Sequence, residues 1–131
     1  LHGGGQTHRM RLDDAILIKD NHLTLSKDIN SVIRASKSKY PNLLVEAEAD
    51  DIEQALQIAR AGANRVLLDN FTPDQAKLAF ESIRSVSDIE IEISGGITIG
   101  NVSYFSPFAD FISLGALTMS SPSVDFSLHV F

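Results

Sequence analysis

The chain has 131 residues, a formal net charge of −6 and no cysteine. A chain without cysteine has no disulfide framework, thiolate nucleophile or cysteine-based metal site, and an acidic chain is a poor bulk partner for nucleic acid. No apolar run approaches the ~20 residues of a membrane-spanning helix. We therefore expect a globular protein with no nucleic-acid or membrane partner, and the composition is consistent with a cytoplasmic location.

Five short apolar runs alternate with longer segments of helical periodicity. The runs cover residues 15–18, 43–45, 65–68, 89–93 and 111–114. Regular spacing of this kind predicts repeated β-α units with parallel strands. We expect a parallel α/β sheet, and five such units fit most of a barrel of the TIM type.

Helix signals fall between the apolar runs. Asp50 offers an N-cap acid with Glu53 three positions later, apolar residues then recur at helical spacing, and Gly62 can end the helix. Another helix is predicted to begin after Thr72, with Pro73 at its first position. Two further helices are expected, a weaker one over 27–38 and a short one over 99–105.

A cluster of cationic groups lies near the amino-terminal end of the sequence. A triple glycine at residues 3–5 precedes His8 and Arg9, and Lys19 ends the first apolar run. Glycine lets the backbone approach a ligand closely, and an arginine binds carboxylate or phosphate at two points. These groups predict a site for a small polyanion; the alternative is a solvated surface cluster in which Arg9 pairs with Asp13 or Asp14.

Other chemically useful residues follow the predicted strands, at the ends where parallel α/β folds bind their ligands. They are Lys19, Glu48, Asp69, Ser94-Gly95-Gly96 and Gly115. A lysine that ends an apolar strand needs a partner, either a substrate anion or an acid such as Asp20, Glu48 or Asp69. A Schiff-base lysine is the alternative chemistry for that position.

Several motifs together resemble one enzyme family. Residues 3–22 resemble the GGGxxHRxxLxDxxLIKDNH segment of the quinolinate phosphoribosyltransferases, and this motif is long enough to be specific. The resemblance continues through Glu46-Ala47-Glu48, Leu67-Leu68-Asp69-Asn70, Ser94-Gly95-Gly96-Ile97 and Leu114-Gly115-Ala116-Leu117-Thr118. It implies that residues 1–131 are the C-terminal part of an open or incomplete (β/α) barrel. The family's sandwich-like N-terminal domain, first barrel strands and basic TRKT-type motif would then lie outside this chain.

The resemblance also implies roles for individual residues. The reaction would join quinolinate to 5-phosphoribosyl-1-pyrophosphate, with decarboxylation, to give nicotinate mononucleotide for NAD synthesis. His8 and Arg9 would bind quinolinate, and Lys19 would lie near the substrate. Glu48 and Asp69 would hold the ribosyl pyrophosphate and its Mg²⁺, whereas Glu46 is a weaker candidate that can be structural. The phosphates would be cradled by the backbone of Ser94, Gly95, Gly96, Gly115 and Ala116.

Two other functions remain open from the sequence. The chain can belong to a related phosphoribosyltransferase with another acceptor, such as a nicotinate-using enzyme, or it can be a non-catalytic ligand-binding or assembly fragment. The resemblance implies a homodimer or larger homo-oligomer. Because the family's basic N-terminal motif is missing, we expect the 131-residue chain to have little activity alone. No metal site is predicted from the histidines.

Overall fold

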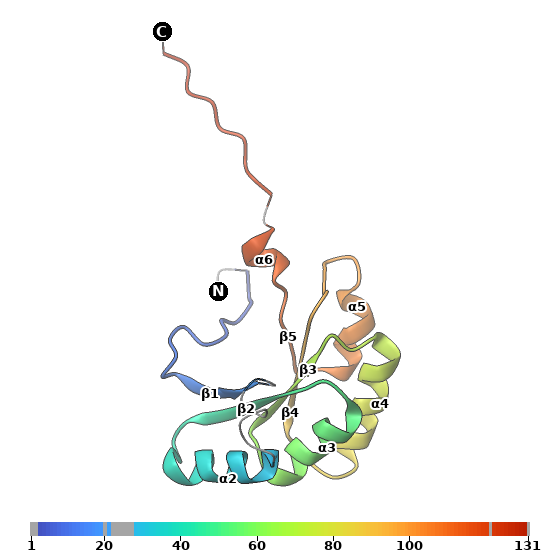
Figure 1. The fold of residues 1–131 in the computed structure, drawn as a ribbon. Helices are drawn as coiled ribbons and strands as arrows, with labels where there is room; N and C mark the ends of the chain where they lie inside the picture. The colour runs from blue at the N-terminus through green and yellow to red at the C-terminus, as the bar shows by residue number, and fades with distance from the viewer. Residues whose placement is uncertain (1–2, 20, 22–27, 121, 131) are drawn as a thin grey trace.

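The structure is a computed structural model that describes residues 3–19, 21, 28–120 and 122–130 (Figure 1). It is an α/β fold built on a five-stranded parallel sheet with the strand order β1-β2-β3-β4-β5. The strands are β1 (Ala15–Ile18), β2 (Leu44–Ala49), β3 (Arg65–Asp69), β4 (Glu90–Ser94) and β5 (Phe111–Ile112). The helices are α2 (Ile29–Lys39), α3 (Ile52–Ala61), α4 (Pro73–Arg84), α5 (Val102–Phe105), the 3₁₀ turn η1 (Ser106–Phe108) and α6 (Ala116–Met119).

The prediction of a parallel α/β sheet is confirmed, and the sheet is open; that it belongs to a barrel of the TIM type stays a prediction. Each strand pairs with the next one along the chain, and the order never reverses as it does in a doubly wound sheet. Within the described residues the sheet runs from β1 to β5 without the two outer strands meeting. The five strands therefore form an open wall rather than a closed cylinder.

Side-chain alternation gives this sheet two very different faces. Along β2, Val45, Ala47 and Ala49 are fully buried and belong to the main hydrophobic core. Residues two apart on a strand share a face, so Glu46 and Glu48 project from the opposite side. The same alternation continues in the neighbouring strands, whose fully buried core residues are Val66, Leu68, Ile91 and Ile93.

In the described part of the chain, α2, α3 and α4 cover the apolar face of the sheet. α2 and α3 pack on β2, α3 also packs on β3, and adjacent helices contact one another in chain order. Figure 1 shows α2, α3 and α4 as a row along one side, with the amino-terminal segment on the other. The helix layer contributes Ile33, Ile58 and Ile83 to the core, each with no exposed surface. The charged face of the sheet is thereby left to the segment that precedes β1.

The helix ends follow from local chemistry, with one error in the prediction. The N-cap of α3 is Asp51 rather than Asp50: its side chain accepts from the Gln54 amide, while the Gln54 side chain accepts from the Asp50 amide. Gln54 therefore takes the reciprocal role that we had expected of Glu53. The predicted end at Gly62 is confirmed, because this residue adopts a left-handed conformation with φ of 82°.

The remaining helices match the predictions to different degrees. α4 has the expected capping box, in which Thr72 and Gln75 satisfy each other's backbone amides. α2 begins at Ile29, with Asp28 as its cap, and the predicted start at Lys27 lies outside the described residues. The short helix predicted over 99–105 is confined to α5, because residues 98–101 form a turn in which Thr98 donates to the Asn101 side chain.

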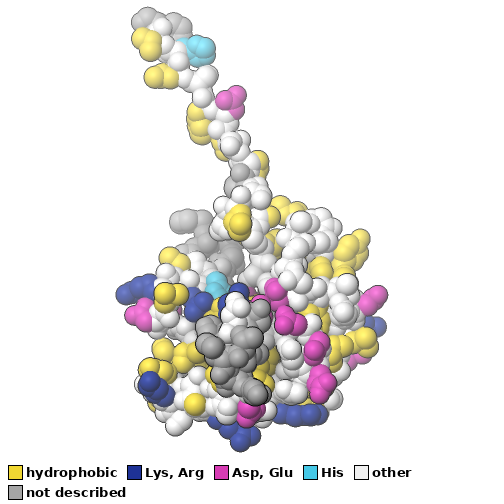
Figure 2. All heavy atoms as spheres, viewed as in Figure 1, with side chains coloured by type: hydrophobic (Ala, Val, Ile, Leu, Met, Phe, Trp, Pro, Cys, Tyr) yellow, Lys and Arg dark blue, Asp and Glu magenta, His cyan; other side chains and the backbone are white. Residues whose placement is uncertain are grey.

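Residues 122–130 form an exposed extended tail beyond α6. Figures 1 and 2 show this tail standing clear of the sheet and helices, with hydrophobic side chains along it. Phe126, Leu128 and Val130 are each 88 or 89% exposed. In the described part of the chain, no helix has the length and apolar character required to cross a membrane.

Candidate active site

Four of the predicted site residues come together at the carboxyl ends of the strands. Lys19 follows β1, Glu48 lies near the end of β2, and Asp69 and Ser94 end β3 and β4. All four line one hollow of about 230 Å³, whose other walls are His8, Leu17, Leu67, Glu92 and Ser113. Parallel strands pointing the same way make this convergence possible, as the sequence predicted.

Lys19 and Glu48 form an ion pair across the first two strands. Lys19 Nζ lies 3.4 Å from Glu48 Oε2, and the lysine side chain is half exposed whereas the glutamate side chain is only 9% exposed. Glu48, one of the three acids predicted as possible partners of Lys19, is therefore in contact with it. Asp20 and His22, at the end of the motif over residues 3–22, lie outside the described residues.

Asp69 is held in a fixed orientation by two donors. Ser94 Oγ donates to Asp69 Oδ1 over 2.8 Å, and the Asn70 side-chain amide donates to Oδ2 over 2.6 Å. One oxygen each of Glu48, Asp50 and Asp69 lies within 4.8 Å of the others. Such a set of carboxylate oxygens suits Mg²⁺, which prefers oxygen ligands and retains several waters. Asp50 was missed in the sequence analysis, where it was assigned only to a helix cap.

The two glycine loops line an adjoining hollow. Ser94, Gly95, Gly96, Gly115 and Ala116 all border a space of about 360 Å³, together with Ile97, Thr98 and Ser113. Gly95 and Gly96 adopt positive φ angles of 90° and 63°. Backbone in this conformation presents N–H groups to an anion without interference from side chains. The helix after the first loop is only four residues long, so the helix-dipole contribution that we expected there is small.

Gly95 is required by its contact with the end of β3. A Cβ atom built on Gly95 would lie 2.3 Å from Asn70 Oδ1 and 2.7 Å from the Asn70 backbone nitrogen. Asn70 itself has a positive φ of 55°, and its amide donates to the Ser94 carbonyl over 3.0 Å. The acid at the end of β3 and the glycine loop after β4 are therefore packed directly against each other.

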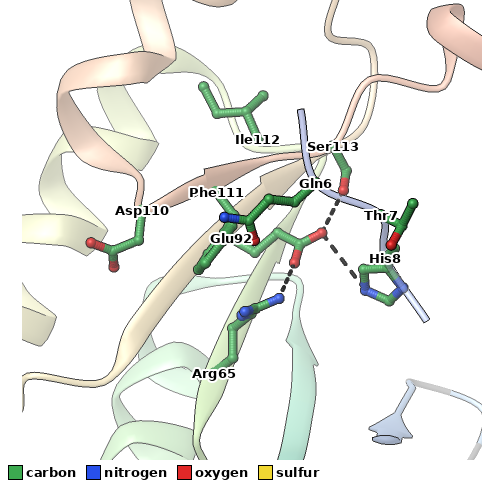
Figure 3. Close-up of a pocket in the computed structure, with 9 residues that line it drawn as sticks. All are labelled: Gln6, Thr7, His8, Arg65, Glu92, Asp110, Phe111, Ile112 and Ser113. Carbon is green, nitrogen blue, oxygen red and sulfur yellow. Dashed lines mark hydrogen bonds and ion pairs between the residues drawn. The ribbon is translucent and has the colours of Figure 1, made fainter. Parts of the chain in front are cut away.

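His8 lies over the centre of the sheet and faces two buried acids (Figure 3). Its Nε2 is 3.3 Å from Glu46 Oε2 and 3.8 Å from Glu92 Oε1, and the two glutamates are 1% and 2% exposed. Burial, followed by the negative charge of Glu92, raises the pKa of Glu46, while His8 and Arg65 act in the opposite direction. Glu46 lies on the same face of β2 as Glu48, and this weaker candidate contacts His8, a predicted ligand-binding residue.

Arg9 lies apart from Lys19, Glu48 and Asp69. It lines a separate hollow of about 280 Å³ near the start of the strands, which His8 and Glu46 also border. Its Nη1 is 3.4 Å from the Ala15 carbonyl oxygen, and its Nε is buried without a hydrogen bond to any described residue. The predicted alternative, pairing with Asp14, is wrong, because Asp14 instead accepts from the amides of Met10 and Arg11.

Sequence reasoning missed an ion-pair network on the same face. Arg65 bridges Glu90 and Glu92, with its guanidinium nitrogens 2.9 Å and 3.1 Å from their carboxylates. The alternation of residues 89–93 does place both glutamates on one face, but the pairing partner depends on strand register. In the sheet Arg65 is aligned with Glu90, which brings the guanidinium into reach of both acids.

A cationic group, carboxylates and glycine loops thus lie along one edge of a parallel sheet, a combination with the chemistry to hold a phosphorylated ligand. The sequence profile of the family "Quinolinate phosphoribosyl transferase, C-terminal domain" matches residues 1–129. The chain therefore belongs to the quinolinate phosphoribosyltransferase family.

Individual relatives agree with this assignment. The chain is 37% identical to human nicotinate-nucleotide pyrophosphorylase [carboxylating], over 98% of this chain and 44% of the human protein. It is 36% identical to the probable enzyme of the same name from Archaeoglobus fulgidus, over 98% of this chain and 50% of that protein. The crystal structure of NadC from Streptococcus pyogenes is similar with a TM-score of 0.85 and 36% identity, over 95% of this chain and 44% of that one. The chain thus spans about half the length of the relatives that it matches.

The packing of Gly95 on Asn70 predicts unequal effects of alanine at the two glycines of the loop. Gly96→Ala adds a Cβ that meets no atom within 4 Å, so it should cost only the ~1–2 kcal/mol of a left-handed backbone. Gly95→Ala adds the same strain and a collision with the backbone of β3, so its loss of unfolding free energy should be clearly larger. Urea denaturation of both variants provides the measurement. Equal losses would show that the end of β3 yields to the added methyl group.

Proposed function

We propose that this chain carries the reaction site of a quinolinate phosphoribosyltransferase. The reaction transfers the phosphoribosyl group of 5-phosphoribosyl-1-pyrophosphate to quinolinate, with loss of CO₂, and yields nicotinate mononucleotide and diphosphate for NAD synthesis. The main support is the convergence of Lys19, Glu48, Asp69 and the Ser94-Gly95-Gly96 loop at one edge of the sheet. The relatives' shared name, nicotinate-nucleotide pyrophosphorylase [carboxylating], agrees with this reaction.

The acidic side of the site suits the ribosyl pyrophosphate. Glu48 and Asp69 would accept hydrogen bonds from the ribose hydroxyls and hold the Mg²⁺ that accompanies the diphosphate, with Asp50 close enough to assist. When bound, the ion would offset negative charge on the leaving diphosphate. The role of Ser94 and Asn70 is to keep the Asp69 carboxylate turned toward the hollow rather than toward solvent.

The glycine side of the site suits the phosphates. Gly95, Gly96, Gly115 and Ala116 border the adjoining hollow, where their backbone N–H groups would donate to a phosphate, and Ser94 and Ser113 line both hollows. A phosphate in one hollow and the ribose in the other would therefore have Ser94 and Ser113 in common. Lys19, paired with Glu48, supplies positive charge to the hollow with Asp69.

The cationic side of the site suits the diacid. Arg9 has a buried Nε without a protein partner among the described residues, which a substrate carboxylate would satisfy. His8 borders both the hollow with Arg9 and the hollow with Lys19, so it would lie between the two substrates. The reaction then needs no covalent nucleophile: positioned charges hold both substrates, and the cationic pyridinium of the nucleotide accepts the electrons released as CO₂ leaves.

The remaining features of the proposal concern assembly. The open sheet would be one wall of a (β/α) barrel of the TIM type, completed by chain beyond these 131 residues. The enzyme would act in the cytoplasm as a homodimer or larger homo-oligomer. The sequential strand order and the single helix layer support the barrel, because a barrel keeps its helices outside and its ligands at the carboxyl ends of its strands.

The activity is tested by comparing the full-length gene product with the 131-residue chain. Each is supplied with quinolinate, 5-phosphoribosyl-1-pyrophosphate and Mg²⁺, and nicotinate mononucleotide is quantified by chromatography. We expect turnover by the full-length product and little or none by the short chain, which matches about half of its relatives' length. Turnover of nicotinate in place of quinolinate by the full-length product would contradict the proposed acceptor.

Arg9→Ala in the full-length product should weaken quinolinate binding much more than ribosyl-pyrophosphate binding. Loss of a charge-assisted contact costs about 1.5–3 kcal/mol, or one to two decades in affinity. Arg34→Ala, which removes an exposed arginine from α2, is the matched control and should change neither affinity. Isothermal titration with each ligand measures both values. Equal weakening of the two ligands by Arg9→Ala would count against its assignment to the diacid.

Asp69→Asn should have the opposite selectivity. The amide keeps the shape of the side chain but removes the negative charge required near Mg²⁺ and the ribose hydroxyls, so ribosyl-pyrophosphate affinity or turnover should fall about tenfold or more while quinolinate binding is retained. Glu48→Gln should act in the same direction, and Asp74→Asn on the surface of α4 serves as the control. Titration of each variant with ribosyl pyrophosphate at several Mg²⁺ concentrations measures the effect. Unchanged Mg²⁺-dependent turnover in both variants would contradict the assignment of Asp69 and Glu48 to this substrate.

A further inference from the structure

Two buried glutamates on the sheet have no role in the substrate contacts described above. Glu46 and Glu92 lie beneath His8, and each is almost completely buried (Figure 3). Burial of a carboxylate is costly unless its oxygens are paired and hydrogen-bonded. Two such groups side by side, with the Glu92 charge raising the pKa of Glu46, therefore need a reason to be retained.

Glu92 is held rigidly by two donors from adjacent strands. Arg65 Nη1 lies 3.1 Å from Glu92 Oε2, and Ser113 Oγ donates to Glu92 Oε1 over 2.5 Å. The guanidinium is itself fixed, because it stacks on the Phe111 ring with its carbon 3.9 Å from the ring centre. Figure 3 shows Arg65 at one carboxylate oxygen of Glu92 and both Ser113 and His8 at the other.

His8 depends on these acids for its orientation. It lies in the segment before β1, where the described residues form neither helix nor strand, so the backbone alone does not fix the ring. Its Nε2 faces Glu46 Oε2 and Glu92 Oε1. Glu92 already accepts from Arg65 and Ser113, so we infer that His8 directs an Nε2–H toward it and that Nδ1 is the ring nitrogen left for a ligand.

The same three residues offer ligand atoms close enough for a metal ion, but their surroundings oppose one. Their oxygens and nitrogen lie within 4.8 Å of one another. Both oxygens of Glu92 already accept from Arg65 and Ser113, and a guanidinium 3.1 Å away repels a second cation. An imidazole N–H donor, not a metal ion, is what this cluster fits.

We propose that Glu92, clamped by Arg65 and Ser113, is a positioning residue that, together with Glu46, orients His8 toward the pyridine dicarboxylate. This inference rests on the proposed function, since it concerns the specificity for the diacid. The contacts run from Arg65 to Glu92 and from Glu92 to His8. Glu92 borders the hollow with Lys19, but both of its oxygens are taken up by Arg65 and Ser113, so we assign it no direct contact with the substrate. Because Glu92 acts only through His8, its replacement should lower the affinity for quinolinate and leave the affinity for ribosyl pyrophosphate unchanged.

The test compares Glu92→Gln with Glu90→Gln in the full-length gene product. Glu90 is a matched control because it lies two residues earlier on the same strand and also contacts Arg65, but it is half exposed and is not in contact with His8. Isothermal titration should show quinolinate affinity reduced roughly tenfold by Glu92→Gln, as for loss of one charge-assisted contact. Ribosyl-pyrophosphate affinity should be unchanged, and Glu90→Gln should leave both affinities unchanged.

A double-mutant cycle with His8→Ala separates positioning from general damage. If Glu92 acts through His8, then Glu92→Gln should have no further effect on quinolinate affinity in the His8→Ala background. Equal weakening of both ligands by Glu92→Gln, or an undiminished effect when His8 is absent, would overturn the inference. Should Glu92→Gln lower the melting temperature too far for titration, Ser113→Ala removes only the hydroxyl of the clamp and is carried through the same cycle.

The outcomes also separate this inference from the proposed function. A wild-type protein that binds no quinolinate would contradict the function itself. If the wild-type protein binds and turns over quinolinate and Glu92→Gln binds it equally well, only the positioning role of Glu92 is contradicted.

Discussion

Alternation of side chains along three parallel strands determines the rest of the structure. Every second residue of β2, β3 and β4 is an aliphatic side chain buried under the helices, and the residues between them are largely charged. Because the side-chain period of a strand is two, a shift of one residue would exchange the two faces. The burial of residues such as Val45 and Ile91 therefore also determines which acids lie on the opposite face of the sheet, where the candidate site is.

The charged face is organised by strand position as well as by sign. Near the starts of the strands, Arg65 and the buried glutamates form a network with few exposed atoms. Nearer the carboxyl ends, Lys19 and Asp69 are more open and line the hollows that a ligand can enter. His8 lies between these two regions and contacts the buried one. The network of Arg65 with Glu46 and Glu92 is thus largely buried, whereas Lys19 and Asp69 border an open hollow.

Much of this arrangement could be read from the sequence, because the signals are local. The apolar runs gave the five strands in the right order, and the capping signals at Thr72 and Gly62 lie within a few residues of the backbone groups that they satisfy. The acidic and glycine residues at the strand ends were predictable for the same reason. Even the error at α3 was local, since two adjacent aspartates compete for the cap and the Gln54 side chain favours Asp51.

What could not be read depends on contacts between distant segments. Arg65 meets Glu92 only because of the register between β3 and β4, and Arg9 meets the Ala15 carbonyl only because of the path of the loop before β1. Neither distance has a signature in residue spacing. Residue spacing also does not show whether the sheet closes, because closure depends on the geometry of all the strands together. The five described strands do not close.

The contact between Asn70 and Gly95 has a consequence for how this site can change over time. Replacing Asn70 by a smaller residue would clear one obstruction above Gly95, but the backbone nitrogen of position 70 would remain 2.7 Å from any new Cβ. No single compensating substitution reopens that space. A remodelled glycine loop must instead displace the end of β3, and Asp69 with it, so the hollow of Asp69 and the hollow of the glycine loops are constrained to evolve as one unit.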